Sequence, residues 1–355
     1  MREHLKMTIK KLAATTAILA AGTSTAFASG LDRVTFSSNI LYEEGTYAEA
    51  TYGLTIPKVS SSALPIGTGT VATSFPTAKL GFKADITDRF AIAVTYTNQP
   101  IGADINYGLS GVSGVVDGQN INALGKYQFS DRISAYGGVK YQYLSGSITV
   151  PGVAIVVSGE GEYGYIVGAA YEIPDIKLRV ALSYESEIDY TLASTVATLA
   201  PVPPTGTTTA STPETWTLEF RSGVAANTLV FGSIRYSQWA DAQITVPAPL
   251  GQITNFTNVT TYELGVAYRF NEKFVGFTAF GYEKSDNEPQ GGFAPPDGQF
   301  DISVGGQLDI GKGFKIASSL KYSKRGDSTL ATVAPGAPFD DNSVLTVGVK
   351  LSKNF

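Results

Sequence analysis

The chain contains no cysteine, and its single histidine, His4, lies in the first ten residues. Without cysteine, an exported protein has no disulfide to hold it together. Without histidine beyond residue 4, the chain also lacks the usual general base, the usual zinc ligand and the imidazole of a serine triad. We therefore expect no enzymatic activity, no metal site and no cofactor.

Charge and long apolar runs are also scarce. Charged residues make up 16 % of the chain, the net charge is −5, and opposite signs are interspersed. No basic stripe exists for nucleic acid, so no nucleic-acid partner is expected. Beyond the first thirty residues, every apolar stretch is broken within a few positions by a charged residue, glycine or proline. This pattern disfavours a helical inner-membrane protein.

The first thirty residues carry the features of an export signal. An apolar run covers residues 12–21, and the small-x-small triplet Ala-Phe-Ala at 26–28 fits a cleavage site; the basic residues before the run are Arg2, Lys6, Lys10 and Lys11. We interpret residues 1–28 as a secretory signal peptide that is removed on export. The alternative is an N-terminal membrane anchor, but the run is shorter than the ~20 residues that a spanning helix needs.

The residues that are abundant favour β-structure. The chain has 38 Gly, 19 Tyr and 18 Phe. Six tight polar turns are predicted near residues 87–90, 130–133, 174–177, 225–228, 271–274 and 311–314. Seven longer connections alternate with them, near residues 58–74, 101–117, 150–155, 193–213, 247–258, 286–299 and 328–341. This spacing predicts fourteen strands of about ten to fifteen residues, long enough to cross a bilayer when tilted.

The pattern within the strands points to a membrane barrel. Leu345, Val347, Val349 and Leu351 alternate with polar residues, as in a strand with one apolar face. Phenylalanines gather beside the short turns and tyrosines toward the long connections, as in two interfacial girdles. An edge strand in lipid must be paired, so the last strand is expected to pair with the first, near residues 46–57.

These features together predict an all-β fold, a fourteen-stranded antiparallel transmembrane β-barrel over residues 46–355. The final Phe355 is interpreted as an assembly signal for the outer membrane of a Gram-negative bacterium, with a strand that ends by chance on phenylalanine as the alternative. The surroundings would then be outer-membrane lipid and lipopolysaccharide. Residues 29–45 show no alternation and are too polar to cross lipid. We expect them to fold into the barrel as a plug, or hatch, through Leu31, Phe36, Asn39 and Tyr42; a disordered periplasmic tail is the alternative.

Three stretches resemble a known family. They are LDRVTFSSNILYEEGTYAEATYGLTIPKVS at 31–60, YTNQPIGADINY at 96–107 and PETWTLEFRSGVAANTLVFGSIRYSQWADAQI at 213–244. They are similar to the outer-membrane long-chain fatty-acid transporters of the FadL type, which include channels for toluene and xylene. The resemblance implies a monomeric barrel with an N-terminal hatch in its lumen. It also implies that hydrophobic molecules pass from an outer apolar groove to a lateral gap between strands.

Candidate functional residues follow from the residues themselves. Apolar residues in the long connections, among them Leu109, Val112 and Phe256, are expected to form a landing site for hydrophobic molecules; packing of loop on loop is the alternative. Asn98, Pro100 and Gly102 are expected to form a kink that opens the wall sideways, or else a simple strand end. Strand parity turns Lys140, Arg221 and Arg235 inward, where they hold a substrate carboxylate or form ion pairs across the lumen.

The expected function is passive transport of hydrophobic compounds, fatty acids ahead of aromatic hydrocarbons. The first alternative is a general diffusion porin for small polar solutes, which the polar inward face favours. The second is a structural or adhesive barrel that presents its loops. An outer-membrane hydrolase comes last, because no histidine is available to activate a serine or a water molecule.

Overall fold

The structure is a computed structural model that describes residues 30–62, 69–198, 201–332 and 335–355. The predicted signal peptide at 1–28 lies outside these residues. Among the residues described, no helix is long and apolar enough to cross a membrane.

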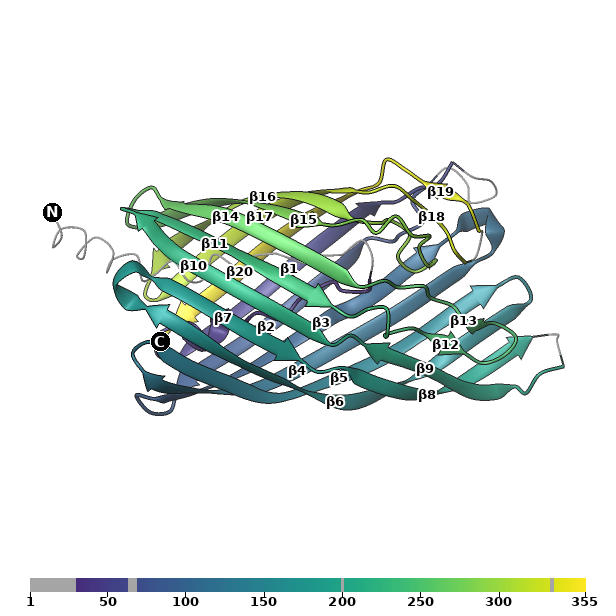
Figure 1. Cartoon of the computed structure of the whole chain (residues 1–355), viewed down its shortest axis with the longest axis horizontal. Helices are drawn as coiled ribbons and strands as arrows, with labels where there is room; N and C mark the ends of the chain where they lie inside the picture. The colour runs from purple at the N-terminus through teal and green to yellow at the C-terminus, as the bar shows by residue number, and fades with distance from the viewer. Residues whose placement is uncertain (1–29, 63–68, 199–200, 333–334) are drawn as a thin grey trace.

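The described chain forms one closed antiparallel barrel (Figure 1). Its wall strands are β1 (Tyr47–Lys58), β2 (Phe75–Asp85), β3 (Phe90–Asn106), β4 (Ser113–Ser130), β5 (Ile133–Val150), β6 (Val153–Ile173), β7 (Leu178–Glu185), β8 (Ile188–Thr198), β9 (Thr205–Thr212), β10 (Thr215–Ala225), β11 (Thr228–Ser237), β14 (Val259–Arg269), β15 (Phe274–Glu283), β16 (Gln299–Gly311), β17 (Phe314–Arg325) and β20 (Ser343–Asn354). Because β7 continues into β8 and β9 into β10, the described chain crosses the wall fourteen times, as predicted.

The remaining elements are short. Two-residue strands lie in the connections: β12 (Thr245–Val246), β13 (Gly251–Gln252), β18 (Ser328–Thr329) and β19 (Pro338–Phe339). Three 3₁₀ turns complete the set: η2 (Ser38–Tyr42), η3 (Gly108–Ser110) and η4 (Pro174–Ile176).

The barrel closes between β1 and β20. The two strands pair without a break from Tyr47 opposite Asn354 to Lys58 opposite Ser343, and β20 pairs with β17 on its other side. Closure pairs the first wall strand with the last, so the sheet has no free end strand, which is the condition for a sheet in an apolar solvent. The predicted closure of the last strand on the first is confirmed.

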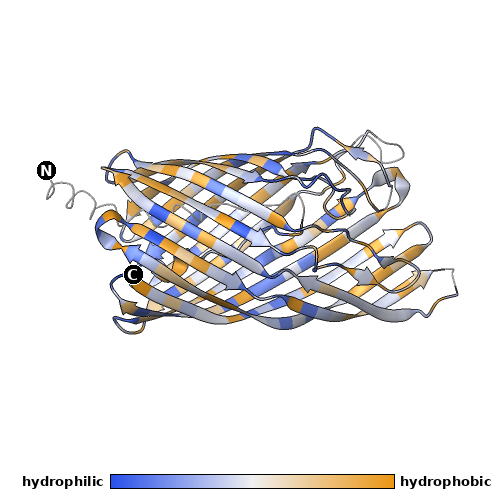
Figure 2. Ribbon diagram, in the orientation of Figure 1, coloured by the Kyte–Doolittle hydropathy of each residue, from blue (hydrophilic) through white to orange (hydrophobic). Residues whose placement is uncertain are grey.

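Alternation places apolar side chains outside and polar ones inside. Along β20, Val349 is 47 % exposed while its neighbour Lys350 is 1 % exposed, facing the interior. Figure 2 shows the same alternation of hydrophobic and hydrophilic residues along the other strands. The outer surface is thus a belt of exposed apolar groups, the reverse of the pattern of a water-soluble sandwich.

The predicted tight turns join the strands at the end of the barrel where the C-terminus lies (Figure 1). They rely on residues with left-handed backbone conformations, such as Lys177, Asn227 and Lys312. At Gly313, φ is +78° and an added Cβ would lie 2.1 Å from the carbonyl oxygen of Asn354. Only glycine fits this position, where the turn passes against the last strand.

The opposite end differs from the prediction in one respect. The stretches 101–117, 150–155 and 193–213, which were expected to be loops, are largely strand: β3 runs to Asn106, β5 and β6 meet across a two-residue turn, and β8 and β9 pair as a hairpin. Pairing continues there because inward side chains such as Ile148, Ile155 and Leu192 are buried against one another. The wall is therefore taller on this side.

Candidate functional site

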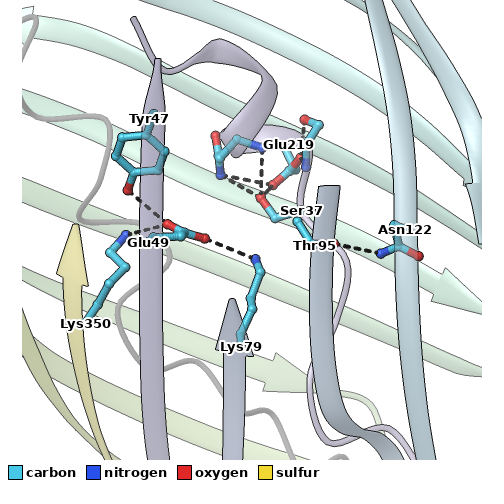
Figure 3. Close-up of polar contacts among 10 residues, drawn as sticks. Ser37, Tyr47, Glu49, Lys79, Thr95, Asn122, Glu219 and Lys350 are labelled. Atoms are coloured by element: carbon cyan, nitrogen blue, oxygen red, sulfur yellow. Dashed lines mark hydrogen bonds and ion pairs between the residues drawn. The ribbon is translucent and has the colours of Figure 1, made fainter. Parts of the chain in front are cut away.

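The segment that precedes β1, residues 30–46, lies inside the barrel; we refer to it as the hatch segment. The start of its 3₁₀ turn η2 is bound by one carboxylate on the wall, that of Glu219 on β10 (Figure 3). Glu219 accepts hydrogen bonds from Ser37 Oγ at 2.6 Å, Ser38 Oγ at 2.7 Å, Ser38 N at 3.0 Å and Asn39 Nδ2 at 3.3 Å. Hydrogen bonds to a charged acceptor are among the stronger ones in proteins, so Glu219 is a principal anchor of the segment.

Basic wall residues hold the end of the segment that leads into β1. Tyr42 shares a hydrogen bond of 3.1 Å with Ser134 Oγ, and its ring lies between Lys126 Nζ at 4.5 Å and the Arg179 guanidinium at 4.1 Å. Lys83 Nζ donates to the carbonyl oxygens of Glu43 at 2.7 Å and Gly45 at 3.0 Å. Arg179 also donates to Asn39 Oδ1.

The beginning of the segment is fixed by a buried ion pair. Asp32 Oδ2 accepts a hydrogen bond from Arg235 Nη1 at 2.8 Å and another from Trp239 Nε1 at 3.0 Å. Leu31, beside it, is buried in an apolar cluster together with Trp239. Arg235 is therefore occupied by the chain itself.

The wall beside the hatch segment is interrupted. In the β3–β4 ladder, Asn98 is opposite Gln119 but Gly102 is opposite Asp117, so β3 carries two extra residues at this point. Gln99 adopts a left-handed φ of 49°. The hatch segment takes over the backbone groups that the bulge frees: Arg33 N and Val34 N donate to Pro100 O at 2.8 and 3.0 Å, and Gly102 N donates to Leu31 O at 2.8 Å. A bulge of this kind bends a strand and breaks its pairing.

A cavity lies at this interruption. It is a hollow of about 600 Å³, open solvent at its mouth included, lined by Gly30, Asp32, Arg33, Thr55, Pro57, Val59, Ala72, Thr73, Phe75, Gly102, Ala103, Asp104, Ile105, Phe293, Ala294, Pro295, Pro296, Arg325 and Val344. We call it the bulge cavity. Most of its lining is apolar, and the Arg33 guanidinium lies 3.7 Å from the centre of the Phe75 ring. Burial lowers the pKa of Arg33 to about 10, although Asp104 and Asp117 act in the opposite direction.

A second cavity lies toward the taller end of the barrel. It is a hollow of about 370 Å³, with open solvent included, lined by Val115, Val116, Leu144, Ser145, Gly146, Ser147, Ile148, Val157, Leu192, Thr208, Ala210, Ile244, Val246, Ile253 and Phe293. We call it the outer cavity. Its apolar residues belong to a large buried cluster that extends to Leu31 and Ile101 beside the bulge. Phe293 lines both cavities, so the two are neighbours across one aromatic ring.

The remaining interior is polar. A hollow of about 890 Å³, open solvent included, lies between η2 and the wall from β10 to β17. Asp301 pairs with Lys321 at 2.9 Å there. Figure 3 shows Glu49 accepting a hydrogen bond from Tyr47 at 2.9 Å and pairing with Lys79 at 3.6 Å and Lys350 at 3.5 Å. Thr95 accepts a hydrogen bond from Asn122 nearby.

The structure places the predicted carboxylate-binding residues in different surroundings. Lys140 Nζ lies 3.2 Å from Glu185 Oε2, and Arg235 is held by Asp32. Arg221 lines the polar hollow, and its Nε has no hydrogen-bond partner among the described residues. Arg235 lines the polar hollow as well, but Lys140 does not, so the three side chains do not converge on one site.

The predicted landing residues also separate. Val112 and Phe256 are buried in the apolar cluster, where Phe256 packs edge-on against Trp239 with ring centres 5.2 Å apart. Leu109, in η3, is 84 % exposed at the rim. The kink residues Pro100 and Gly102 do meet Arg33 and Leu31 of the hatch segment at the bulge. Asn98 instead accepts a hydrogen bond from Ala78 N on β2.

Sequence reasoning missed three of the residues that make these contacts, namely Asp32, Arg33 and Glu219 as the anchor of the hatch segment. One signal was available. Glu219 is at an inward position of β10, where its carboxylate needs hydrogen-bond donors. The polar run Ser-Ser-Asn at 37–39 supplies them.

Comparisons with known proteins bear on the fold. Neither the models of protein families nor the curated proteins give a match. Among solved structures, a FadL homologue of Pseudomonas aeruginosa has a TM-score of 0.75 at 13 % identity, covering 96 % of this chain and 98 % of that one. The toluene transporter TbuX of Ralstonia pickettii has 0.66 at 15 % identity, covering 94 % and 98 %. The monoaromatic hydrocarbon channel CymD has 0.65 at 11 % identity, covering 96 % and 98 %. The chain therefore has the fold of these FadL-type barrels.

Proposed function

We propose that this barrel is a passive channel of the Gram-negative outer membrane for hydrophobic compounds, with long-chain fatty acids as the first substrate class and monoaromatic hydrocarbons as the second. The three similar structures are a FadL homologue, a toluene transporter and a hydrocarbon channel, which supports the general class. The belt of exposed apolar side chains supports a bilayer as the solvent of the outer surface. We infer a monomer, because the wall closes within one chain.

The driving force is the removal of apolar surface from water. Each buried methylene is worth ~0.8 kcal/mol, so an acyl chain of about fourteen methylenes gains on the order of 10 kcal/mol on leaving water. A polar pore offers no such gain. Consecutive apolar cavities let the molecule move down its gradient in steps, each weak enough to allow release.

The observation that carries the proposal is the position of the bulge cavity. It lies where the β3–β4 ladder is interrupted, and its neighbour across Phe293 is the outer cavity. A molecule that enters among the apolar residues of the outer cluster would pass Phe293 into the bulge cavity. It would leave sideways between Asn98 and Gly102, without crossing the polar lumen.

Deleting Pro100 and Ile101 tests this route. The deletion removes the two extra residues of β3, so that Asn98 and Gly102 fall into one register with β4 and the ladder closes. We expect uptake of both oleate and toluene by vesicles that contain the protein to fall to the level of vesicles without it. The matched control is Pro100→Ala, which keeps both extra residues and should keep uptake. Undiminished uptake after the deletion would rule out the lateral route.

Single-channel conductance separates the proposal from a general porin. The polar hollow favours the porin, whereas the hatch segment, bound to Glu219, Arg235 and Lys83, crosses the interior. We expect conductance near the baseline together with uptake of hydrophobic compounds. A large, steady ionic current without such uptake would identify a porin.

A further inference from the structure

The barrel wall has a second interruption, between β6 and the strand beside it. β6 pairs with β7 from Ile173 opposite Leu178 to Ile166 opposite Glu185, and with β8 from Val157 opposite Ser194 to Val153 opposite Thr198. Across this seam, residues 158–164 and 187–193, all of them described, form no ladder pairs; we call this region the slit. On their other sides the edges are paired, β6 with β5 except at Ser158 and Gly159, and β8 with β9 from Ile188 onward.

The slit has a geometric cause. Opposite residues of an antiparallel ladder point to the same face of the sheet. The β6–β7 ladder and the β6–β8 ladder on either side of the slit have the same register. However, the alternation of inward and outward side chains shifts by one residue at different points in β6 and in the β7–β8 strand. Between β7 and β8 the change comes at Glu185 and Ser186, both buried, so that Ile188 already faces inward. β6 changes face only near residue 159, so Tyr163, which would oppose Ile188, is exposed. Partners that point to opposite faces cannot form a ladder.

Side chains close the slit in place of backbone hydrogen bonds. The β6 edge is rich in glycine, and at Gly164 an added Cβ would lie 2.8 Å from Ile188 Cγ1. Tyr190 of β8 is 2 % exposed and reaches past β6 to donate a hydrogen bond to Gln142 O on β5 at 3.0 Å. A seam closed by side chains has no ladder hydrogen bonds to break, so it opens at a lower cost than a paired seam.

One apolar hollow lies on the outer wall beside the slit, starting at Tyr165, and another lies inside the barrel. Outside, an open groove of about 950 Å³, solvent included, is formed with the rings of Tyr165, Tyr184 and Trp216. The ring centres lie 5.8 Å apart for Tyr165 and Tyr184, and 4.8 Å for Tyr184 and Trp216. Inside, Val157 and Leu192 stand next to the slit and also line the outer cavity. Tyrosine and tryptophan on a lipid-facing wall mark the level of the membrane interface.

The edges of the slit carry charge of one sign. Glu160 and Glu162 lie on the β6 edge, and Glu187 and Asp189 on the β8 edge, with no lysine or arginine in either segment. Four carboxylates repel a fatty-acid head group and are indifferent to a neutral hydrocarbon.

We propose that the slit is a second lateral gate, through which neutral aromatic hydrocarbons dissolved in the outer leaflet reach the outer cavity without passing the extracellular rim. The proposal rests on the proposed function for what happens beyond that cavity. The slit differs from the bulge in β3 in three respects. It lies elsewhere in the wall, molecules enter through it and do not leave, and carboxylates line its mouth. Tyr190 and Ile188 are the closing side chains.

A reversible bridge across the slit tests the gate. Tyr163→Cys and Asp189→Cys place one thiol on each edge of the slit, both at exposed positions on the outer face, and the absence of native cysteine makes these the sole thiols. The pair is joined with a short reducible bis-methanethiosulfonate. We expect toluene uptake to fall about fivefold or more relative to the unbridged variant, to recover on reduction, and oleate uptake to stay unchanged. The control bridge joins Tyr171→Cys and Val180→Cys, which already oppose each other in the β6–β7 ladder and lie outside the groove, and should change neither.

Two results would overturn the gate: unchanged toluene uptake in the bridged protein, or equal losses of toluene and oleate. A binding measurement keeps the test independent of transport. With the purified protein in lipid nanodiscs, the exchange rate of fluorobenzene, measured by ¹⁹F NMR, should fall about fivefold on bridging. If neither compound crosses the membrane but this exchange still slows, the proposed function fails and the gate stands. Unchanged exchange would refute the gate by itself.

Discussion

At the scale of single residues, the cation best placed to meet a substrate carboxylate is Arg33. It lines the bulge cavity, donates to Gln99 Oε1 at 2.5 Å and lies over the Phe75 ring. Burial lowers its pKa to about 10, so the guanidinium is still charged at neutral pH. Arginine keeps further donors after one is used, which leaves it able to bind a carboxylate.

Replacing Arg33 with alanine should distinguish the two substrate classes. Hydrogen bonds to charged groups contribute about 1.5–3 kcal/mol, so oleate uptake at limiting concentration should fall roughly tenfold to a hundredfold, and toluene uptake should stay the same. In the unaltered protein, the contribution of Arg33 to oleate uptake should be present below pH 10. It should be lost as the pH rises through about 10, where Arg33 loses its proton. Arg132→Ala, in an exposed turn, controls for the change in net charge. An equal loss of both compounds would show that Arg33 acts through the hatch segment.

The sequence had pointed to other cations, and the reason is physical. Strand parity correctly turns Lys140, Arg221 and Arg235 inward, but parity says nothing of what faces them. The partner of Lys140 lies 45 positions away, and that of Arg235 lies 203 positions away on the hatch segment. Such pairs are set by the curvature and closure of the whole wall, and no local pattern encodes them.

At the scale of elements, the hatch segment depends on one wall residue more than on any local propensity. Its 3₁₀ turn has five residues and gains little stability on its own. Contacts with the wall hold it instead: four hydrogen bonds to Glu219, and one each to Arg179 and Ser134. The polar composition predicted a segment that folds inward; its anchor could not be predicted, because Glu219 lies about half the chain away.

Glu219→Gln should loosen this anchor. The amide keeps one acceptor oxygen, but its nitrogen turns a donor toward the donors of Ser37, Ser38 or Asn39, at a cost of about 1–3 kcal/mol for the groups left unpaired. We expect more frequent openings in single-channel recordings and faster proteolysis of residues 30–46. Glu263→Gln is the matched control, because Glu263 lines the same polar hollow and, among the described residues, makes no hydrogen bond to the hatch segment. Equal effects of Glu219→Gln and Glu263→Gln would contradict the role of Glu219 as the anchor of the hatch segment.

The strands themselves show where pattern reading works. Alternation of large apolar and polar residues found the wall from β14 to β20, where outward positions hold residues such as Leu264, Val304 and Val347. It failed at 193–213, which is rich in threonine, alanine and proline and carries few large apolar residues. There β8 and β9 form through pairing with neighbours that are already in place.

At the scale of the whole molecule, the apolar belt implies a bilayer around the wall. Val349 lies midway along β20, outward and 47 % exposed, whereas Leu345 on the same face lies nearer the taller end. Lysine on a lipid-facing wall costs about 2–4 kcal/mol at the bilayer midplane and about 0–1 kcal/mol near the interface.

The two positions provide a depth test on one strand. Val349→Lys should lower the free energy of unfolding in lipid vesicles, measured by guanidinium titration, by about 2–4 kcal/mol, and Leu345→Lys by about 1 kcal/mol or less. The second variant is the control for an added charge on the same face. If both substitutions prove harmless, water and not lipid surrounds this wall.

The taller side of the wall has one more consequence. β5 and β6 meet at Pro151 and Gly152, both exposed, in a two-residue turn with Gly152 at a φ of 80°. With this end of the barrel facing outward, as in the proposed function, the exposed tip would be accessible to an antibody. A foreign epitope grafted between Pro151 and Gly152 would be displayed to the outside world while the cavities below keep their shape.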